Sequence, residues 1–308
     1  ARVPCVAGCP AHVDIPGYIS LVEAGRYADA VKVIRKNNPL PLVCGLVCEH
    51  PCEMHCRRGM VDDPMNILAL KRFAVEHSDL NDHRPHVVDN TGKRVAVIGG
   101  GPAGLATAFF LTRAGVPVTI FEARDSLGGV VRHVIPEFRI ASDDISHDAE
   151  LCLAFGAKVQ LNARVKSIDE LKAQGFTDVV VATGAWMPGS AGLGEGAELD
   201  VLEFLEAAKK GEKLELGEDV VVIGTAMDAA RVAKRLAGVK NVRLVYRRTK
   251  KQMPADEEEL DLALADGVEF CELLAPKALN GAVLTCDVME LGEPDASGRR
   301  SPVATGET

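Results

Sequence analysis

The first third of the chain has the apolar spacing of short amphipathic helices. Across residues 14–38, apolar side chains recur three or four positions apart, with an interruption at Gly25, so two short helices are expected there. Residues 64–77 predict a further helix. Its expected apolar face consists of Ile67, Leu70 and Phe73.

Beyond about residue 90, apolar strand-like runs alternate with helical patterns. Residues 95–98 are followed by a glycine-rich turn, a helical segment at 103–113 and a second apolar run at 118–121, which predicts a β-α-β unit. The same order recurs after about residue 218. We therefore expect an α/β protein in which an N-terminal α-helical domain precedes two tandem Rossmann-like domains.

The polar segment 83–92, with its proline and glycine, is expected to be a linker. We expect the helical domain at residues 1–90, a first dinucleotide-binding domain at 91–185 and a second at 186–308, with the chain ending before the first of these domains closes.

Composition narrows the class of protein. Hydrophobic residues make up 47% of the 308 residues and charged residues 26%, which excludes a disordered or fibrous chain. No apolar run approaches the roughly 18 residues of a membrane span, so no membrane insertion is expected. The formal net charge of -9 opposes nucleic-acid binding. Without an export signal, we expect a cytoplasmic protein whose partners are proteins or small molecules.

The turn after the first predicted strand has the spacing of a dinucleotide-binding loop. Gly99, Gly101 and Gly104 fit G-x-G-x-x-G, and Glu122 closes the next strand, where an acid that binds ribose is expected. The glycines permit a tight turn, a close approach of the pyrophosphate and close packing of the helix. A glycine-rich turn without a ligand is the alternative, but strand, helix and acid are all in place. Dinucleotide binding is therefore predicted.

Two further motifs indicate which dinucleotide binds. Gly128 and Gly129 follow Glu122 closely, and Thr183 and Gly184 follow another run that we expect to be a buried strand. These motifs resemble the glycine pair and the ATG segment of two-dinucleotide flavoprotein reductases. In those enzymes FAD occupies the first fold and a nicotinamide nucleotide the second.

The second predicted fold lacks a complete glycine loop. Only Gly224 stands where G-x-G-x-x-G is expected, so the pyrophosphate cradle is missing as written. Arg247 and Arg248 follow the next predicted strand, where guanidinium groups accommodate the 2′-phosphate of NADPH. A solvated basic surface is the alternative interpretation of these two arginines.

Six of the nine cysteines lie within the first 56 residues, and Cys9 is followed by proline as in bacterial ferredoxins. The six are Cys5, Cys9, Cys44, Cys48, Cys52 and Cys56. A disulfide framework is disfavoured in a long chain without an export signal, so metal ligation is predicted. A four-cysteine zinc site and unligated core cysteines are the alternatives, and the predicted flavin favours iron. No C-x-x-C pair is present, which argues against a thioredoxin-reductase-like mechanism.

Together these motifs resemble the iron-sulfur flavoprotein family of the glutamate synthase small subunit. The family includes the large subunit of a ferredoxin:NADP oxidoreductase, the N-terminal half of dihydropyrimidine dehydrogenase and a selenate-reductase-like iron-sulfur/FAD subunit. The resemblance covers essentially the whole chain. It runs through CVAGCPAHVDIPGYI, NNPLPLVCGLVCEHPCEMHCRRG, VIGGGPAGL, IPEFRI, VVVATGA, TAMDAAR, YRR and MPADEEE.

The resemblance implies one or two 4Fe-4S clusters. One cluster would be bound by Cys9, Cys48 and Cys52. Cys5 and Cys56 would join two earlier cysteines on a second cluster, whereas Cys44 matches a position that is usually not a ligand. The fourth ligand of the first cluster is often Glu or Gln, but Lys71 stands at the matching place, and a protonated amine cannot bind iron.

The resemblance also assigns the nucleotide contacts. The residues expected to bind FAD are Gly99, Gly101, Pro102, Ala103, Gly104, Glu122, Ala123, Arg124, Gly128, Gly129, Val130, Arg139, Val165, Thr183 and Gly184. Those expected to bind NAD(P)H, with NADPH favoured, are Gly224, Thr225, Ala226, Arg247 and Arg248. The second glycine loop is about three residues shorter than in the family, and we expect this sequence to belong to a longer polypeptide.

These features predict an oxidoreductase that moves electrons between NAD(P)H, FAD and 4Fe-4S clusters within a larger complex or chain. Hydride would pass between nicotinamide C4 and flavin N5, and single electrons between flavin and cluster. Other redox subunits or domains are the expected partners. No catalytic acid, base or nucleophile is assigned. A non-catalytic electron-relay or assembly subunit that has lost nicotinamide binding is the alternative, and a zinc-containing flavoprotein is a third possibility.

Overall fold

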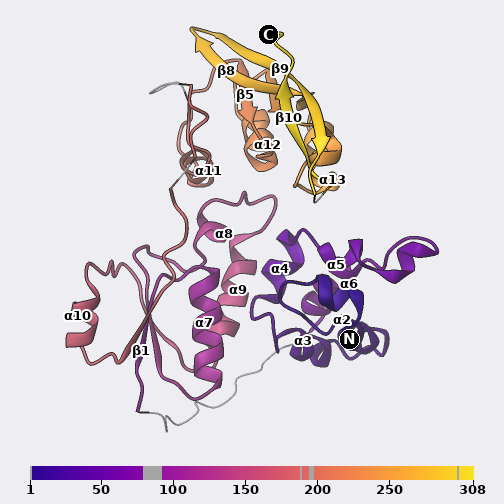
Figure 1. Ribbon diagram of the computed structural model, residues 1–308. Coiled ribbons are helices and arrows are strands. Elements are labelled where there is room, and N and C mark those ends of the chain that lie inside the picture. The colour runs from indigo at the N-terminus through magenta and orange to yellow at the C-terminus, as the bar shows by residue number, and fades with distance from the viewer. Residues whose placement is uncertain (1, 79–91, 188, 194–197, 297) are drawn as a thin grey trace. The chain divides into compact units, whose positions relative to one another are not determined.

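The computed structural model describes residues 2–78, 92–187, 189–193, 198–296 and 298–308. The chain divides into two compact units (Figure 1). Unit 1 consists of Ala1–His133 and Glu137–Gly184, and unit 2 of Val134–Pro136 and Ala185–Thr308. The predicted linker at 83–92, except Gly92, and the domain boundary near residue 90 lie outside the described residues. The division into three domains therefore stays a prediction.

The N-terminal part of unit 1 is helical, as expected. Its elements are α1 (Pro4–Gly8), α2 (Ile15–Glu23), α3 (Tyr27–Ile34), α4 (Pro41–Val47), α5 (Pro51–Met54), the 3-10 helix η1 (Arg57–Met60) and α6 (Ile67–Glu76). Gly25, with φ of 69°, separates α2 from α3, which confirms the predicted break. The buried Tyr18 of α2 donates a hydrogen bond of 2.9 Å to the carbonyl oxygen of Ile67 and so ties α2 to α6.

The predicted apolar face of α6 is wrong at one position. Ile67 is buried and Leu70 partly buried, but the side chain of Phe73 is 38% exposed. Phe73 instead stacks on His77, with ring centroids 3.9 Å apart, and meets the edge of Tyr27. The helix turns by about 100° per residue, and six positions after Ile67 the side chain has rotated away from the core.

The remainder of unit 1 is a parallel sheet with strand order β3-β2-β1-β4. Its elements are β1 (Val95–Ile98), α7 (Pro102–Arg113), β2 (Val118–Phe121), α8 (Val130–His133), α9 (Ser142–Leu153), β3 (Lys158–Gln160), α10 (Ile168–Ala173) and β4 (Asp178–Val181). Helix α7 packs against β1 and β2, and α9 packs on α7. Helix α10 lies on the other side of the sheet, where Leu171 joins a core that includes Ala96 and Phe121 (Figure 1).

The strand that precedes Thr183 differs from its prediction. We expected it to be buried, but β4 is the edge strand of the described sheet, and Val181 is 61% exposed. By contrast, all four residues of β2 are buried. A run of valines does not distinguish an edge strand from a central one, because strand order is decided by tertiary contacts.

Unit 2 contains the second expected β-α-β unit and an antiparallel sheet. Its elements are α11 (Val201–Lys209), β5 (Asp219–Ile223), α12 (Met227–Arg235), β6 (Asn241–Tyr246), the 3-10 helix η2 (Lys250–Gln252), α13 (Glu257–Ala265), β7 (Glu269–Glu272), β8 (Leu274–Asn280), β9 (Val283–Pro294) and β10 (Arg300–Ala304). Strands β5, β6 and β7 are parallel, and β10, β9 and β8 are antiparallel.

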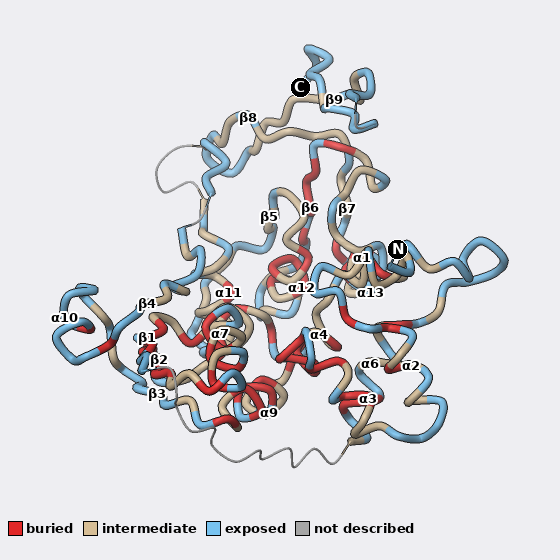
Figure 2. The backbone as a smooth tube through the Cα atoms, turned by 60° about the horizontal axis from the view of Figure 1, so that its bottom comes forward, coloured by how far each residue is buried: buried red, intermediate tan, exposed pale blue. Residues whose placement is uncertain are grey.

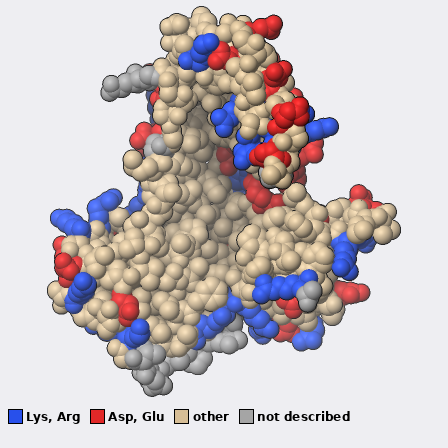
Figure 3. Space-filling view, in the orientation of Figure 1, with Lys and Arg blue, Asp and Glu red and all other residues tan. Residues whose placement is uncertain are grey.

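Buried residues are concentrated in helices and strands that pack on one another (Figure 2). Buried stretches appear in α4, α9 and β6, whereas charged side chains of both signs are interspersed over the face drawn in Figure 3. The core of unit 2 joins α12 and α13 to β6 through Met227, Leu244 and Leu260.

Candidate dinucleotide and iron-sulfur sites

Three motifs predicted to bind FAD lie at one edge of the sheet in unit 1. Strands β1, β2 and β4 are parallel and in register, with Ile98 opposite both Phe121 and Val181. The segments that follow these strands therefore leave the sheet at the same edge. They contain the glycine loop at 99–104, Glu122 with the glycine pair, and Thr183 with Gly184.

The first and third glycines of the loop are required by close contacts within the protein. At Gly99, with φ of 109°, a Cβ would overlap the carbonyl oxygen of Ala182, so the loop lies directly against the segment after β4. At Gly104, a Cβ would overlap the carbonyl oxygen of Gly99. Helix α7 can therefore begin close to the turn only because both positions lack side chains.

Gly101 has a different role. The nearest protein atom to a Cβ at this position would be Gly129 Cα at 3.5 Å, an ordinary van der Waals distance. Gly101 is the N-cap of the 12-residue helix α7, with φ of -76°, and no side chain caps that helix. The helix N-terminus is thus open to an anion, and the protein itself does not require glycine at this position. This combination fits a pyrophosphate at Gly101.

Glu122 is held by the loops around it. It is 8% exposed, and its carboxylate accepts hydrogen bonds from the backbone N–H of Gly100 at 2.6 Å and of Arg124 at 2.8 Å. Because each carboxylate oxygen can accept more than one hydrogen bond, the group keeps capacity for a ribose hydroxyl. Glu122 therefore links the glycine loop to the segment after β2.

Arg132 is a residue of this region that sequence reasoning missed. Its guanidinium donates to the carbonyl oxygen of Leu127 and, at 2.7 Å, to the hydroxyl of Ser146 on α9. A Cβ on Gly128 would lie 2.7 Å from Arg132 Cβ, so the glycine pair is closely packed against this side chain. An arginine three residues after a glycine pair carries no recognisable motif, so its role follows only from the packing.

Three other predicted FAD residues lie farther along unit 1. Val130 begins the short helix α8, and Arg139 is half-buried in the segment between α8 and α9. The side chain of Val165 packs beside the core that contains Phe121, so a contact of this residue with a nucleotide would use its backbone groups.

In unit 2, Gly224 follows β5 with φ of 96°, and no atom lies within 4 Å of a Cβ built there. Thr225 and Ala226 lead into the nine-residue helix α12, whose N-terminus no side chain caps. The loop therefore offers helix amides to an anion, but it lacks the close glycine contacts seen in unit 1.

The two arginines that are predicted to bind the 2′-phosphate of NADPH differ in their exposure to solvent. Arg247 is exposed at the end of β6, whereas Arg248 is 8% exposed. Among the described atoms, Arg248 Nε is buried without a hydrogen-bond partner. A buried donor of this kind fits a phosphate, because guanidinium groups bind phosphate oxygens through several N–H groups.

Three cysteines of unit 1 lie at helix ends. Cys9 and Cys48 are the C-caps of α1 and α4, and Cys56 is the N-cap of η1. The pKa of Cys52 is raised to about 11, mainly by burial and to a smaller extent by the neighbouring Cys9, Glu53 and Cys48. Cys9 and Cys48 therefore lie near enough to Cys52 to affect its pKa, and their assignment to one cluster stays a prediction.

Cys5 and Cys56 have other neighbours. Cys5 packs against the helical core that contains Cys52. The backbone N–H of Met65 points at Cys56 Sγ from 3.5 Å and lowers the pKa of that thiol, which favours the thiolate that a metal requires.

Comparison with known proteins identifies the two parts of the chain. Residues 1–83 match the family described as dihydropyrimidine dehydrogenase domain II, 4Fe-4S cluster, and residues 93–271 match the pyridine nucleotide-disulphide oxidoreductase family. The chain is 33% identical to the glutamate synthase (NADPH) small chain of Escherichia coli K12, over 96% of this chain and 69% of that protein. The chain belongs to the glutamate synthase small subunit-like family of iron-sulfur flavoproteins.

Other members extend beyond the region in common. The putative oxidoreductase YgfK of Escherichia coli K12 is 45% identical over 99% of this chain, but the chain spans only 30% of its length. The fold is shared with FprA of Mycobacterium tuberculosis in complex with NADPH, with a TM-score of 0.59 and 18% identity over 73% of this chain and 68% of that one.

Family membership confirms the predicted fold class and cofactors. The iron-sulfur flavoprotein combines a domain of a 4Fe-4S family with a domain of the pyridine nucleotide-disulphide oxidoreductase family. Among the described helices, none combines the length and the apolar character that crossing a bilayer would require.

The family match favours iron over the zinc site that the sequence left open, because residues 1–83 match a family described by its 4Fe-4S cluster. Within the described ranges, no three His, Cys, Asp or Glu side chains converge as they would around one metal ion.

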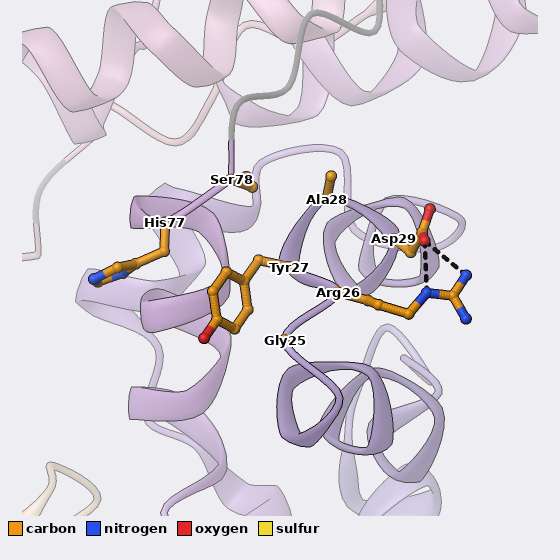
Figure 4. A pocket seen from close by; sticks show the side chains of 7 residues that line it. All are labelled: Gly25, Arg26, Tyr27, Ala28, Asp29, His77 and Ser78. Carbon is orange, nitrogen blue, oxygen red and sulfur yellow. Dashed lines mark hydrogen bonds and ion pairs between the residues drawn. The ribbon is translucent and has the colours of Figure 1, made fainter.

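One surface pocket lies in the helical part of the iron-sulfur flavoprotein (Figure 4). It is lined by Gly25, Arg26, Tyr27, Ala28, Asp29, His77 and Ser78. Arg26 and Asp29 form an ion pair of 2.7 Å there, and Tyr27 and His77 line the opposite part. None of the predicted cofactor ligands lines this pocket.

Proposed function

We propose that this chain is the electron-transfer module that carries reducing equivalents from NADPH through FAD to iron-sulfur clusters. One observation supports this most directly. The glycine cradle at the end of β1 and the cysteine-bearing helices belong to the same compact unit. When bound, FAD exchanges hydride with nicotinamide and single electrons with a cluster, which is chemistry that the protein does not supply itself.

The residues of this chain bind and orient the cofactors. Gly101 and the N-terminus of α7 would hold the FAD pyrophosphate, and Glu122 would accept a hydrogen bond from its ribose. Gly104 and Gly99 keep the helix close to the turn, which aims the helix amides at the anion. Cys9, Cys48 and Cys52 would bind one cluster, and Cys5 and Cys56 a second, together with further ligands.

The preference for NADPH rests on the arginines after β6. Arg247 is exposed and free to reach a ligand in solvent, and Arg248 presents a buried donor. A 2′-phosphate would bind both guanidinium groups, whereas the ribose hydroxyl of NADH offers no negative charge. The relative named for NADPH glutamate synthase supports this choice.

We propose the division into an iron-sulfur domain at 1–90, an FAD-binding domain at 91–185 and an NAD(P)H-binding domain at 186–308. The partners would be other redox subunits or domains, because the glutamate synthase relative is a small chain and YgfK is much longer than this chain. We also propose a cytoplasmic location, where reduced nicotinamide nucleotides are available.

A relay without nicotinamide binding is the second candidate. It is motivated by the open space around Gly224, where the close glycine packing of unit 1 is absent among the described atoms. The two candidates share FAD and iron, and they differ only in their response to NADPH.

Anaerobic reduction of the full-length protein tests the proposal. NADPH is expected to bleach the flavin absorbance and then to reduce the clusters, and NADH is expected to act less efficiently. A flavin that stays oxidised with NADPH but is reduced by dithionite would support the relay. A preparation without flavin or iron would contradict both candidates.

A further inference from the structure

Helix α4 obtains its N-terminal cap from a distant part of the chain. The residue before it is Leu40, and no side chain of its own segment caps the helix. Instead, the backbone N–H of Val43 donates a hydrogen bond of 2.8 Å to Oδ2 of Asp148, which belongs to α9 and is 0% exposed. The first amides of a helix need acceptors from outside it. Helix α9 of the flavin-binding fold therefore completes a helix of the cysteine-rich region.

A residue of the helical region in turn donates a hydrogen bond to helix α9. Arg35, at the end of α3, donates a hydrogen bond of 2.8 Å to the carbonyl oxygen of Leu151, in the last turn of α9. Its guanidinium also lies 5.0 Å from the ring centre of Phe109 on α7. A cation at the C-terminal end of a helix satisfies the carbonyl groups that have no partner within the helix. We call Arg35, Val43, Asp148 and Leu151 the interlock.

Burial makes the interlock hard to rearrange. Arg35 is 4% exposed and Asp148 is 0% exposed. A buried polar group that loses its hydrogen-bond partner destabilises the fold, and sliding α4 along α9 would leave several such groups unsatisfied. Burial also raises the pKa of Asp148, although His147 beside it opposes this. A neutral carboxyl group still accepts the Val43 hydrogen bond through its carbonyl oxygen.

Helix α4 carries Cys44 and ends at Cys48, its C-cap. The helix has only seven residues, so its first turn fixes the position of its last one. We propose that Asp148 is a positioning residue for electron transfer, which fixes α4 and therefore the cluster thiolate of Cys48 against the flavin-binding domain. This inference rests on the proposed function, and specifically on Cys48 as a cluster ligand.

The interlock takes no part in the redox step itself. Electron transfer between the bound cofactors would neither form nor break a bond within the interlock. Positioning matters because the rate of electron transfer falls as the distance between the flavin and the cluster grows. Asp148 would act only by keeping the distance between the two cofactor sites of unit 1 constant.

The test compares Asp148→Ala with Asp148→Asn in the full-length protein with its cofactors. Stopped-flow absorbance follows flavin reduction by NADPH, and freeze-quench EPR follows cluster reduction. Asp148→Ala is expected to slow cluster reduction severalfold and to leave flavin reduction nearly unchanged. Asp148→Asn keeps an oxygen that can accept from Val43, so it is expected to restore most of the rate. Hydrogen exchange of the Val43 amide should rise in the alanine variant alone.

Glu150→Ala is the matched control, because Glu150 is an exposed acid on the same helix. An alanine variant at Asp148 with wild-type cluster reduction would overturn the proposal. An asparagine variant as slow as the alanine variant would also overturn it, because charge rather than position would then be responsible. If Asp148→Ala does not fold, Arg35→Lys tests the same interlock and is expected to show the same separation of the two rates. Failure of the wild-type protein to reduce its clusters would instead contradict the proposed function.

Discussion

Replacement of Gly101 by alanine would show whether glycine is needed at this position for the stability of the protein or for the binding of FAD. An alanine Cβ would have Gly129 Cα at 3.5 Å as its nearest protein neighbour, and φ of -76° is open to any L-residue. Such a change gains about 0.4–1 kcal/mol from the unfolded state, and the loss of glycine at an N-cap offsets part of it. The unfolding free energy of the apoprotein should therefore change by less than about 1 kcal/mol.

FAD binding should respond differently to the same methyl group. At the N-terminus of α7 it would occupy space that we assign to the pyrophosphate. Overpacking of this kind costs about 1–3 kcal/mol, which corresponds to about fivefold to 150-fold weaker binding. Quenching of flavin fluorescence during titration of the apoprotein measures this affinity, and thermal unfolding measures its stability.

Gly104→Ala is the comparison variant. Its Cβ would overlap the carbonyl oxygen of Gly99, so the apoprotein itself should lose at least about 1–3 kcal/mol of stability. If Gly101→Ala bound FAD with wild-type affinity, the pyrophosphate would have to lie elsewhere. If Gly104→Ala left the apoprotein as stable as the wild type, the close packing of α7 on the turn would be refuted.

Three further predictions concern the clusters, the nucleotide preference and the helical core. Cys48→Ser should lower the content of iron and acid-labile sulfide by about one cluster, because Cys48 is a predicted cluster ligand. Cys271→Ser should leave both contents unchanged, because Cys271 is not a predicted ligand. Equal iron content in the two variants would contradict the assignment. Arg247→Ala should raise KM for NADPH by about tenfold, from loss of a charge-assisted hydrogen bond, with KM for NADH nearly constant; parallel changes would show that Arg247 does not read the 2′-phosphate. Tyr18→Phe should lower the unfolding free energy by about 0.5–1.5 kcal/mol in denaturant titrations, because the hydrogen bond from the Tyr18 hydroxyl to the carbonyl oxygen of Ile67 is lost. An unchanged midpoint would show that this hydrogen bond does not stabilise the fold.

Local patterns in the sequence were sufficient for much of the fold. The strands at 95–98 and 118–121 lie where the apolar runs predict them, and α7 begins one residue before the predicted helix. These elements could be predicted because glycine, proline and apolar periodicity act on neighbouring residues. Phe73 was misassigned because helical spacing defines a face of the helix but not how much of it the neighbouring helices cover.

The sequence likewise predicted some residues of the candidate sites but not others. The glycine loop, Glu122 and the cysteines could be found from spacing, since the ligands themselves demand those residue types at fixed intervals. Arg132 could not be found because it belongs to no recognisable motif. Asp148 could not be found because its partner, Val43, is distant along the chain. The different exposure of Arg247 and Arg248 likewise depends on which neighbours pack beside the end of β6.

The amino-acid sequence by itself determined the β-α-β order in both nucleotide-binding folds, the family and the classes of cofactor, because these depend on short-range periodicity and on motifs with fixed spacing. It did not indicate the antiparallel sheet of β8, β9 and β10. Only the tertiary structure decided that Gly101 faces Gly129, that β4 is an edge strand and that a carboxyl group of α9 caps α4. The physical reason is that hydrogen bonds and steric contacts between segments 22 to 105 residues apart depend on the tertiary path of the chain.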